Sequence, residues 1–139
     1  MTSRYVAFEP GDKIPVEVTD PGTSSPGDLV EVSGEGSEFT QVQQATDDAA
    51  AIGMLVTDPS DDTTDDMVRV SKPVYYLNPE GTYTPSAGDL VAERAGGTVS
   101  DTLGDGTTAV TRSDAYGLVV GTNVRSLHVG DRVAVAVYR

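Results

Sequence analysis

The chain is most regular in AYGLVV at residues 115–120 and in GDRVAVAV at residues 130–137. An earlier stretch follows the same pattern, with AIGMLV at residues 51–56 and DMVRV at residues 66–70. In both places an apolar run with a glycine in third position precedes an alternating run of valines. Alternation of this kind is typical of β-strands.

A third landmark strengthens the match between the two halves. The tetrapeptide GDLV occurs at residues 27–30 and again at residues 88–91, so three landmarks recur in the same order. Recurrence in a fixed order is the sequence signature of an internal repeat. We therefore predict a duplicated half-domain, with a first repeat at residues 27–77 and a second at residues 88–139, related by a pseudo-two-fold axis.

Short strands separated by turn residues predict the fold class. Ile14, Val16 and Val18 alternate with polar or turn residues, and Pro15 places this strand at a sheet edge. With 15 glycines and no sustained helical period, the 139 residues predict one all-β domain, a compact β-barrel or sandwich with little or no helix.

The charge balance limits the possible partners. The chain has 22 acidic and 9 basic residues, a net charge of −13, and Lys13 and Lys72 are its only lysines. Such a surface disfavours direct binding of nucleic acid. It is tolerated where concentrated salt screens the charges, which favours a halophilic host. The alternative is an ordinary acidic protein kept soluble by its charge.

Two absences in the sequence narrow the chemistry. The chain has no cysteine, which excludes disulfides and thiolate zinc sites. It has no apolar run long enough to cross a bilayer, and residues 1–7 do not resemble a secretory signal. We expect a soluble protein without a membrane partner.

Side chains for catalysis or metal binding are sparse. His128 is the only histidine, and its position before the turn at Asp131 is typical of an exposed loop residue. An acidic loop could offer oxygen ligands to a hard cation such as Ca²⁺, although its spacing differs from an EF-hand and an incidental solvated loop is the alternative. The residues of this possible metal site are Asp61, Asp62, Asp65 and Asp66.

The Gly-Asp pairs have a structural interpretation. They begin at residues 11, 27, 88 and 130, each just before a predicted strand. Glycine adopts positive φ in tight turns, and the aspartate side chain bonds to neighbouring backbone. These acids are therefore turn residues, and we predict a protein that is not an enzyme and needs no cofactor.

The order of these motifs resembles a known family. Pro-Gly-Asp at residues 10–12, GDLV at 27–30, the strand at 51–56, Val-Arg-Val at 68–70 and AGDLV at 87–91 are similar to the small β-barrel capsid decoration proteins of tailed double-stranded DNA viruses. The resemblance implies a virion protein that binds the outer surface of the major capsid protein lattice, often as a trimer, and stabilises the head. It implies no catalytic residues, and the acidic composition would suit a virus of a halophilic archaeon.

The N-terminal segment, residues 1–10, is the candidate for contact with the capsid. It is either an arm or a plain first strand, and Arg4, Tyr5, Val6 and Phe8 offer the aromatic and arginine anchors that commonly dominate interfaces.

Two other functions remain open. A virion fibre base or carbohydrate-binding adhesion module could use exposed Tyr75, Tyr76 and Tyr83 to stack on sugars. A small β-barrel enzyme would instead need a buried carboxylate in a cleft.

Overall fold

The computed structural model describes residues 6–36, 38–46, 51–60, 66–122, 128–129 and 131–138. All regular structure in these ranges is β-strand, as predicted, and none of it is a helix that could cross a membrane. The strands are β1 (Val6–Phe8), β2 (Lys13–Val18), β3 (Leu29–Glu35), β4 (Thr40–Gln44), β5 (Ala51–Leu55), β6 (Asp66–Val70), β7 (Val74–Leu77), β8 (Leu90–Arg94), β9 (Thr98–Ser100), β10 (Gly117–Gly121), β11 (His128–Val129) and β12 (Arg132–Val137).

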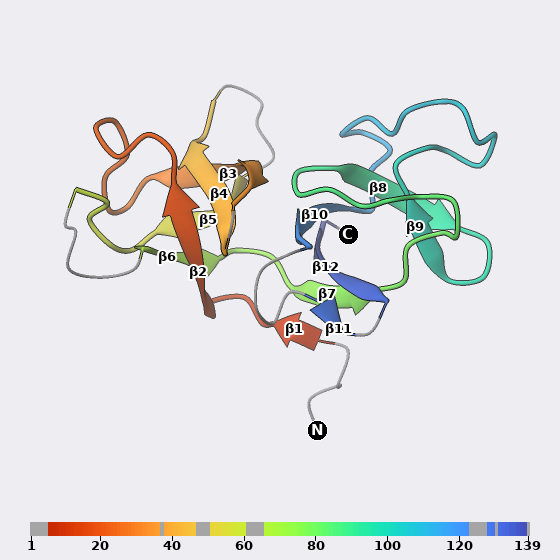
Figure 1. The fold of residues 1–139 in the computed structure, drawn as a ribbon, viewed down its shortest axis with the longest axis horizontal. Coiled ribbons are helices and arrows are strands. Elements are labelled where there is room, and N and C mark those ends of the chain that lie inside the picture. Colours follow the sequence, from red (N-terminus) through yellow and green to blue (C-terminus); the bar gives the residue numbers. More distant parts are fainter. Residues whose placement is uncertain are drawn as a thin grey trace.

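The first part of the chain forms a closed barrel (Figure 1, left). Its strand order is β2-β4-β3-β5-β6, with β6 returning to β2. The β2–β4 pair is parallel and the other pairs are antiparallel. The prediction that Pro15 marks a sheet edge is wrong, because β2 is paired on both sides. Pairing with β4 begins only at Val16, so the amide hydrogen that proline lacks is not needed on that side.

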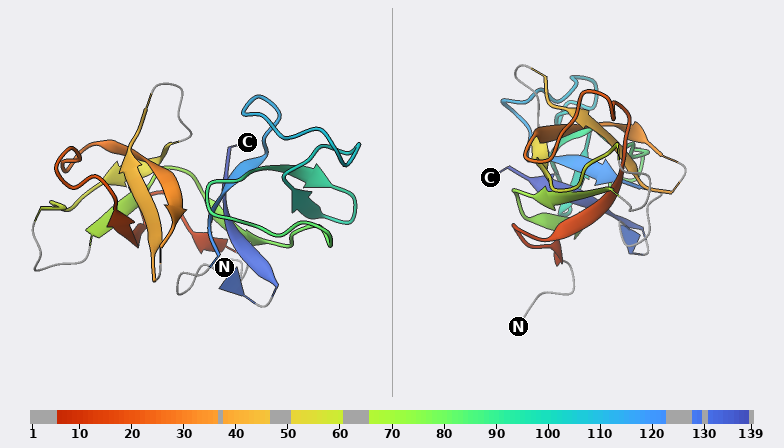
Figure 2. Two further views of the ribbon diagram at one scale, coloured as in Figure 1. Left: turned by 45° about the horizontal axis from the view of Figure 1, so that its top comes forward. Right: turned by 90° about the vertical axis from the view of Figure 1, so that its left-hand side faces the viewer.

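The second part of the chain forms a curved sheet in the order β1-β7-β12-β10-β8-β9, with β11 on β12 (Figures 1 and 2). The chain that follows β7 lies beside β9 in a parallel bridge between Pro79 and Val99. Glu80 N donates a 2.7 Å bond to Val99 O. This hydrogen bond joins the segment after β7 to β9, at the place where β2 pairs with β4 in the first barrel.

The two parts share one pattern of strand pairing. In the first, Thr19 N follows β2 and donates a 2.9 Å bond to Val42 O of β4, the counterpart of the Glu80–Val99 bond. Strands β2, β4, β3, β5 and β6 correspond in order to β7, β9, β8, β10 and β12. We call residues 11–70 the first unit and residues 72–138 the second unit.

The Gly-Asp pairs form one recurring turn. In Gly27–Asp28 the glycine has φ +96°, and the aspartate carboxylate accepts a 2.9 Å bond from Ser25 N. Gly11–Asp12 and Gly88–Asp89 repeat the positive φ and the bond from the residue three positions before the aspartate. The predicted turn chemistry is confirmed at these three pairs, while Gly130 lies outside the described residues.

Strand pairing gives different repeat boundaries from those drawn on the sequence. β7, placed at the end of the first repeat by the sequence, corresponds to β2 and opens the second unit. Val68 lies opposite Leu55, and Val135 lies opposite Val119, so Val68 corresponds to Val135 and not to Val133. On the sequence, matching Asp66-Met67-Val68 to Asp131-Arg132-Val133 pairs Val68 with Val133. This match is displaced by two residues, because an alternating strand repeats its pattern at that interval.

The two units are held together by a continuous core. Second-unit side chains such as Leu118 and Val120 belong to the same buried cluster as Val30 of the first barrel. Thr40 Oγ1 donates a buried 2.9 Å bond to Val120 O. The Glu35 carboxylate accepts further bonds from the second unit, at 2.9 Å from Ala87 N, 2.7 Å from Thr122 Oγ1 and 3.2 Å from Thr122 N.

Candidate functional site

The predicted capsid-contact segment includes an edge strand. Val6 and Phe8 lie in β1, antiparallel to β7, and no described strand pairs with the other side of β1. Phe8 is partly buried against the core shared by the units, so its ring already has a structural role. Arg4 and Tyr5 lie outside the described residues, and capsid contact stays a prediction.

The acidic loop is largely beyond what the structure describes. Asp61, Asp62 and Asp65 lie outside the described residues, while Asp66 begins β6 and accepts a 3.0 Å bond from the Thr57 hydroxyl. Within the described ranges, no three histidine, aspartate or glutamate side chains are grouped so that they could hold a metal ion. Cation binding by the loop stays a prediction.

His128 lies in a strand and not in the predicted loop. It forms part of the short strand β11, where it is opposite Val133 of β12, and Asp131 is exposed. The imidazole of His128 lies outside the described side chains.

The three tyrosines proposed for sugar stacking do not share an exposed face. Tyr76 and Tyr83 are buried, with 8% and 9% of their surfaces exposed. The Tyr83 hydroxyl donates a 2.6 Å bond to Asp89 Oδ2. The expectation of exposure is therefore wrong for these two, because alternation in β7 turns Tyr76 toward the first unit and Tyr83 closes the interior of the second.

Tyr75 instead lies beside two tyrosines that the sequence did not single out. It lines a pocket of about 410 Å³ at one end of the second unit, together with Tyr116 and Tyr138. Burial raises the pKa of Tyr138 to about 12, an effect reduced by the nearby positive charge of Arg112. We call this site the tyrosine pocket. Its other lining residues are Lys72, Pro73 and Val137.

The repeat contains a signal for this pocket that sequence reasoning missed. Tyr138 N donates a 2.9 Å bond to Tyr116 O, and Ser71 N donates a 3.0 Å bond to Ile52 O at the corresponding place in the first unit. Aligning the units by strand register would have brought Tyr116 and Tyr138 together.

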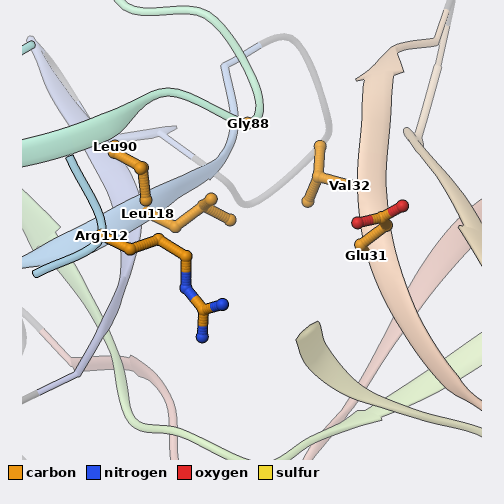
Figure 3. A pocket seen from close by; sticks show the side chains of 6 residues that line it. All are labelled: Glu31, Val32, Gly88, Leu90, Arg112 and Leu118. Carbon is orange, nitrogen blue, oxygen red and sulfur yellow. The ribbon is translucent and has the colours of Figure 1, made fainter. Parts of the chain in front are cut away.

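A second cavity lies in the seam between the units (Figure 3). It has a volume of about 220 Å³, and we call it the inter-unit cleft. Glu31 and Val32 of β3 form one wall, and Leu90 and Leu118 approach from the second unit. Gly88 and Arg112 complete the lining.

The chemistry of the inter-unit cleft suits packing or weak polar binding. The Glu31 carboxylate already accepts a 2.7 Å bond from Gln43 Nε2 and a 3.2 Å bond from the Thr46 hydroxyl. The six lining residues include one carboxylate and one guanidinium, with no serine, histidine or lysine to act as a nucleophile or base. The cleft therefore does not assemble a catalytic pair from its own lining.

Comparison with known proteins gives no further guide to the site. No protein-family model matches the sequence, and neither a curated protein nor a solved structure shows significant similarity to it.

Proposed function

We propose that the protein is a structural component of a virus particle, which binds the outer surface of an assembled capsid and stabilises it without catalysis. The observation that carries the proposal is the ordered series of motifs from Pro-Gly-Asp at residues 10–12 to AGDLV at residues 87–91. Glycines 11, 27 and 88 of this series form the recurring turns, so the resemblance rests on residues that build both units.

The body of the protein supports a mechanical role. The shared core, the Thr40–Val120 bond and the three bonds to Glu35 tie the units to one another at several points. A body braced in this way can transmit load between neighbouring capsid subunits without first unfolding at its centre. Repeated copies on a symmetric lattice would add avidity to a weak single contact.

The edge strand β1 supports a specific mode of contact. An unpaired strand edge can accept another chain through backbone hydrogen bonds. β1 continues directly from Arg4 and Tyr5, which supply side chains for the same contact. Contacts of this kind persist in concentrated salt, because they do not depend on long-range attraction.

Co-sedimentation with stripped capsids tests the proposal. The capsids come from particles in which mass spectrometry of purified virions finds the protein, and the assay is run in molar potassium chloride. The full chain is compared with a form lacking residues 1–5, a deletion that spares β1 and the packed ring of Phe8.

The two outcomes separate the function from the contact segment. We expect the full chain to sediment with the capsids and the shortened chain to bind at least about 10-fold more weakly, as loss of anchor residues implies. If the full chain fails to bind, or if the protein is absent from purified virions, the capsid role is wrong. Equal binding by both forms would contradict only the contribution of Arg4 and Tyr5 to the contact.

Carbohydrate binding remains the second candidate, because one observation favours it. The tyrosine pocket gathers Tyr75, Tyr116 and Tyr138, and tyrosine rings can stack on the apolar faces of sugars. An oligosaccharide array probed with the wild type and with Tyr116→Ala would identify such a ligand.

A further inference from the structure

The two units meet through unlike surfaces. The side of the second-unit sheet that carries Tyr76, Leu118 and Val120 belongs to one buried cluster with Ile14 and Val70 of the first barrel. Ile14 lies where β2 begins and Val70 where β6 ends, so this sheet face covers one end of the first barrel.

The arrangement is head to tail, so the predicted pseudo-two-fold relation between the repeats is wrong. A Cβ at Gly88 would lie 3.6 Å from Val32 Cγ1 across the seam, whereas a Cβ at the corresponding Gly27 would have no atom within 4 Å. A two-fold relation would bury both positions alike. The seam is formed by a sheet face of the second unit and by one end of the first barrel. The first unit therefore has a corresponding sheet face, and the second unit a corresponding barrel end, that lie outside the seam.

The first unit carries the counterpart of the covering sheet face. Lys13, Arg69, Met54 and Leu29 lie in register across β2, β6, β5 and β3. In the second unit the same row faces the seam. It consists of Val74, Ala136, Leu118 and Leu90.

This counterpart is exposed, and it is apolar on the side of β5 and β3. Leu29 is 57% exposed and Met54 is 38% exposed, and they are the exposed large hydrophobic side chains of the described chain. Pro15 and Met67 lie in the next row, opposite one another. We call this surface the outer face of the first unit. It consists of Lys13, Pro15, Leu29, Met54, Met67 and Arg69.

The tyrosine pocket is the counterpart of the covered barrel end. Tyr75 and Tyr116 occupy the places of Ile14 and Ile52, which are each 1% exposed in the first unit. In the second unit nothing in the described chain covers this end, and the pocket of about 410 Å³ lies there.

We infer that copies of this chain bind one another head to tail, with the outer face of the first unit of one copy covering the tyrosine pocket of the next. The occupant is a second copy, because the chain already joins the corresponding two surfaces within itself at the seam between its units. This inference does not depend on the capsid role.

The chemistry of the two surfaces is compatible. Leu29 and Met54 would lose their contact with water against tyrosine rings, and methionine and aromatic side chains attract one another. Lys13 and Arg69 lie next to one another on the β2–β6 side of this apolar patch, and Arg69 Nη1 donates a 2.6 Å bond to Gly11 O. The contacts of Leu29 and Met54 are short-range contacts, which a net charge of −13 opposes least in concentrated salt.

Head-to-tail contacts either close into a ring or continue as a filament, according to the rotation between copies.

Complementary variants test the inference by sedimentation velocity in molar potassium chloride. Leu29→Lys places an ammonium group in the outer face at a position that is 57% exposed, so we expect the fold to be retained. Tyr75→Lys does the same in the tyrosine pocket, and Tyr75→Ala serves if the first replacement unfolds the protein. Thr107→Lys adds the same charge on an exposed loop as the matched control.

The expected pattern is specific to head-to-tail binding. The wild type and Thr107→Lys should form species larger than a monomer, and Leu29→Lys and the pocket variant should each associate at least about 100-fold more weakly, because an ammonium group would be buried without a partner. An equal mixture of the two variants should form dimers and stop there, since each retains one intact surface. A monomeric wild type, a Leu29→Lys variant that associates normally, or a mixture that stays monomeric would each overturn the inference.

Discussion

The Tyr83 hydroxyl donates a 2.6 Å bond to Asp89 Oδ2, which also accepts a 2.9 Å bond from Ser86 N. Burial, and then the hydrogen bond to Asp89, raise the pKa of Tyr83 above its ordinary value. The folded protein therefore holds this proton more tightly than the unfolded chain does. The stability that follows is fully present below pH about 10, where unfolded tyrosine is protonated, and it is lost as the pH rises toward the folded pKa.

We predict that Tyr83→Phe lowers the free energy of unfolding by about 1–2 kcal/mol at pH 7, because Asp89 loses one of its two partners. Above pH 10 the difference from the wild type should shrink, since the variant has no proton to lose at this position. Urea unfolding at pH 7 and at several values up to pH 11 measures both effects. Tyr75→Phe is the control for loss of a tyrosine hydroxyl, and a difference that stays constant with pH would contradict the linkage.

At the scale of strands, β5 and β6 approach one another closely at Gly53. A Cβ at this position would overlap the Arg69 carbonyl oxygen and lie 2.9 Å from Val70 Cα. Gly117, the corresponding residue of β10, is equally constrained, because its Cβ would overlap the Ala136 carbonyl oxygen and lie 2.7 Å from Val135 Cγ1. Backbone atoms cannot turn aside as the end of a flexible side chain can, so any added atom must separate the strands.

We predict that Gly53→Ala and Gly117→Ala each cost about 1–3 kcal/mol of stability, the range for overpacking a tight interior. Gly81→Ala is the matched control, since its Cβ would have no atom within 4 Å and its φ is not in the left-handed region. The control should be neutral or slightly stabilising, because alanine restricts the unfolded chain. Thermal and urea unfolding of the three variants decides, and equal stability of Gly53→Ala and Gly81→Ala would contradict the close approach.

The same elements show what the sequence could and could not predict. The Gly27–Asp28 turn was predictable because its hydrogen bonds connect residues three apart in the chain. The correspondence of β7 with β2 was not, because it depends on pairing with β12 and β9, which no local pattern reveals. The position of β1 was not predictable either. It pairs with β7, and most of the first unit separates these two strands in the sequence.

The candidate surfaces were less predictable than the fold. Alternation in β7 indicates that Tyr75 and Tyr76 face opposite sides, but not which side the first unit covers. The exposure of Leu29 follows from the absence of a partner in the chain and not from its residue type, since its counterpart Leu90 is partly buried. The exposure of these side chains depends on how the two units pack, so it could not be predicted from the sequence alone.

At the scale of the whole molecule, charge is the dominant feature. A net charge of −13 on 139 residues opposes the compact state, because folding brings like charges closer together. The Debye length is about 10 Å in 0.1 M salt and about 3 Å in 1 M salt, so concentrated salt removes most of this repulsion between exposed groups. A halophilic origin would supply that salt in the native setting.

We predict that the melting temperature rises by at least about 5 °C between dilute buffer and molar potassium chloride, since about 1–2 kcal/mol of relieved repulsion would produce a shift of this size in a domain of this length. Sucrose is the control solute, because it stabilises by exclusion from the protein surface without screening charge. The double variant Asp101→Asn and Asp131→Asn removes two exposed acids and should need less salt to reach the same melting temperature. Equal melting temperatures in dilute buffer and molar salt would contradict the halophilic proposal and leave the capsid role to be decided by co-sedimentation alone.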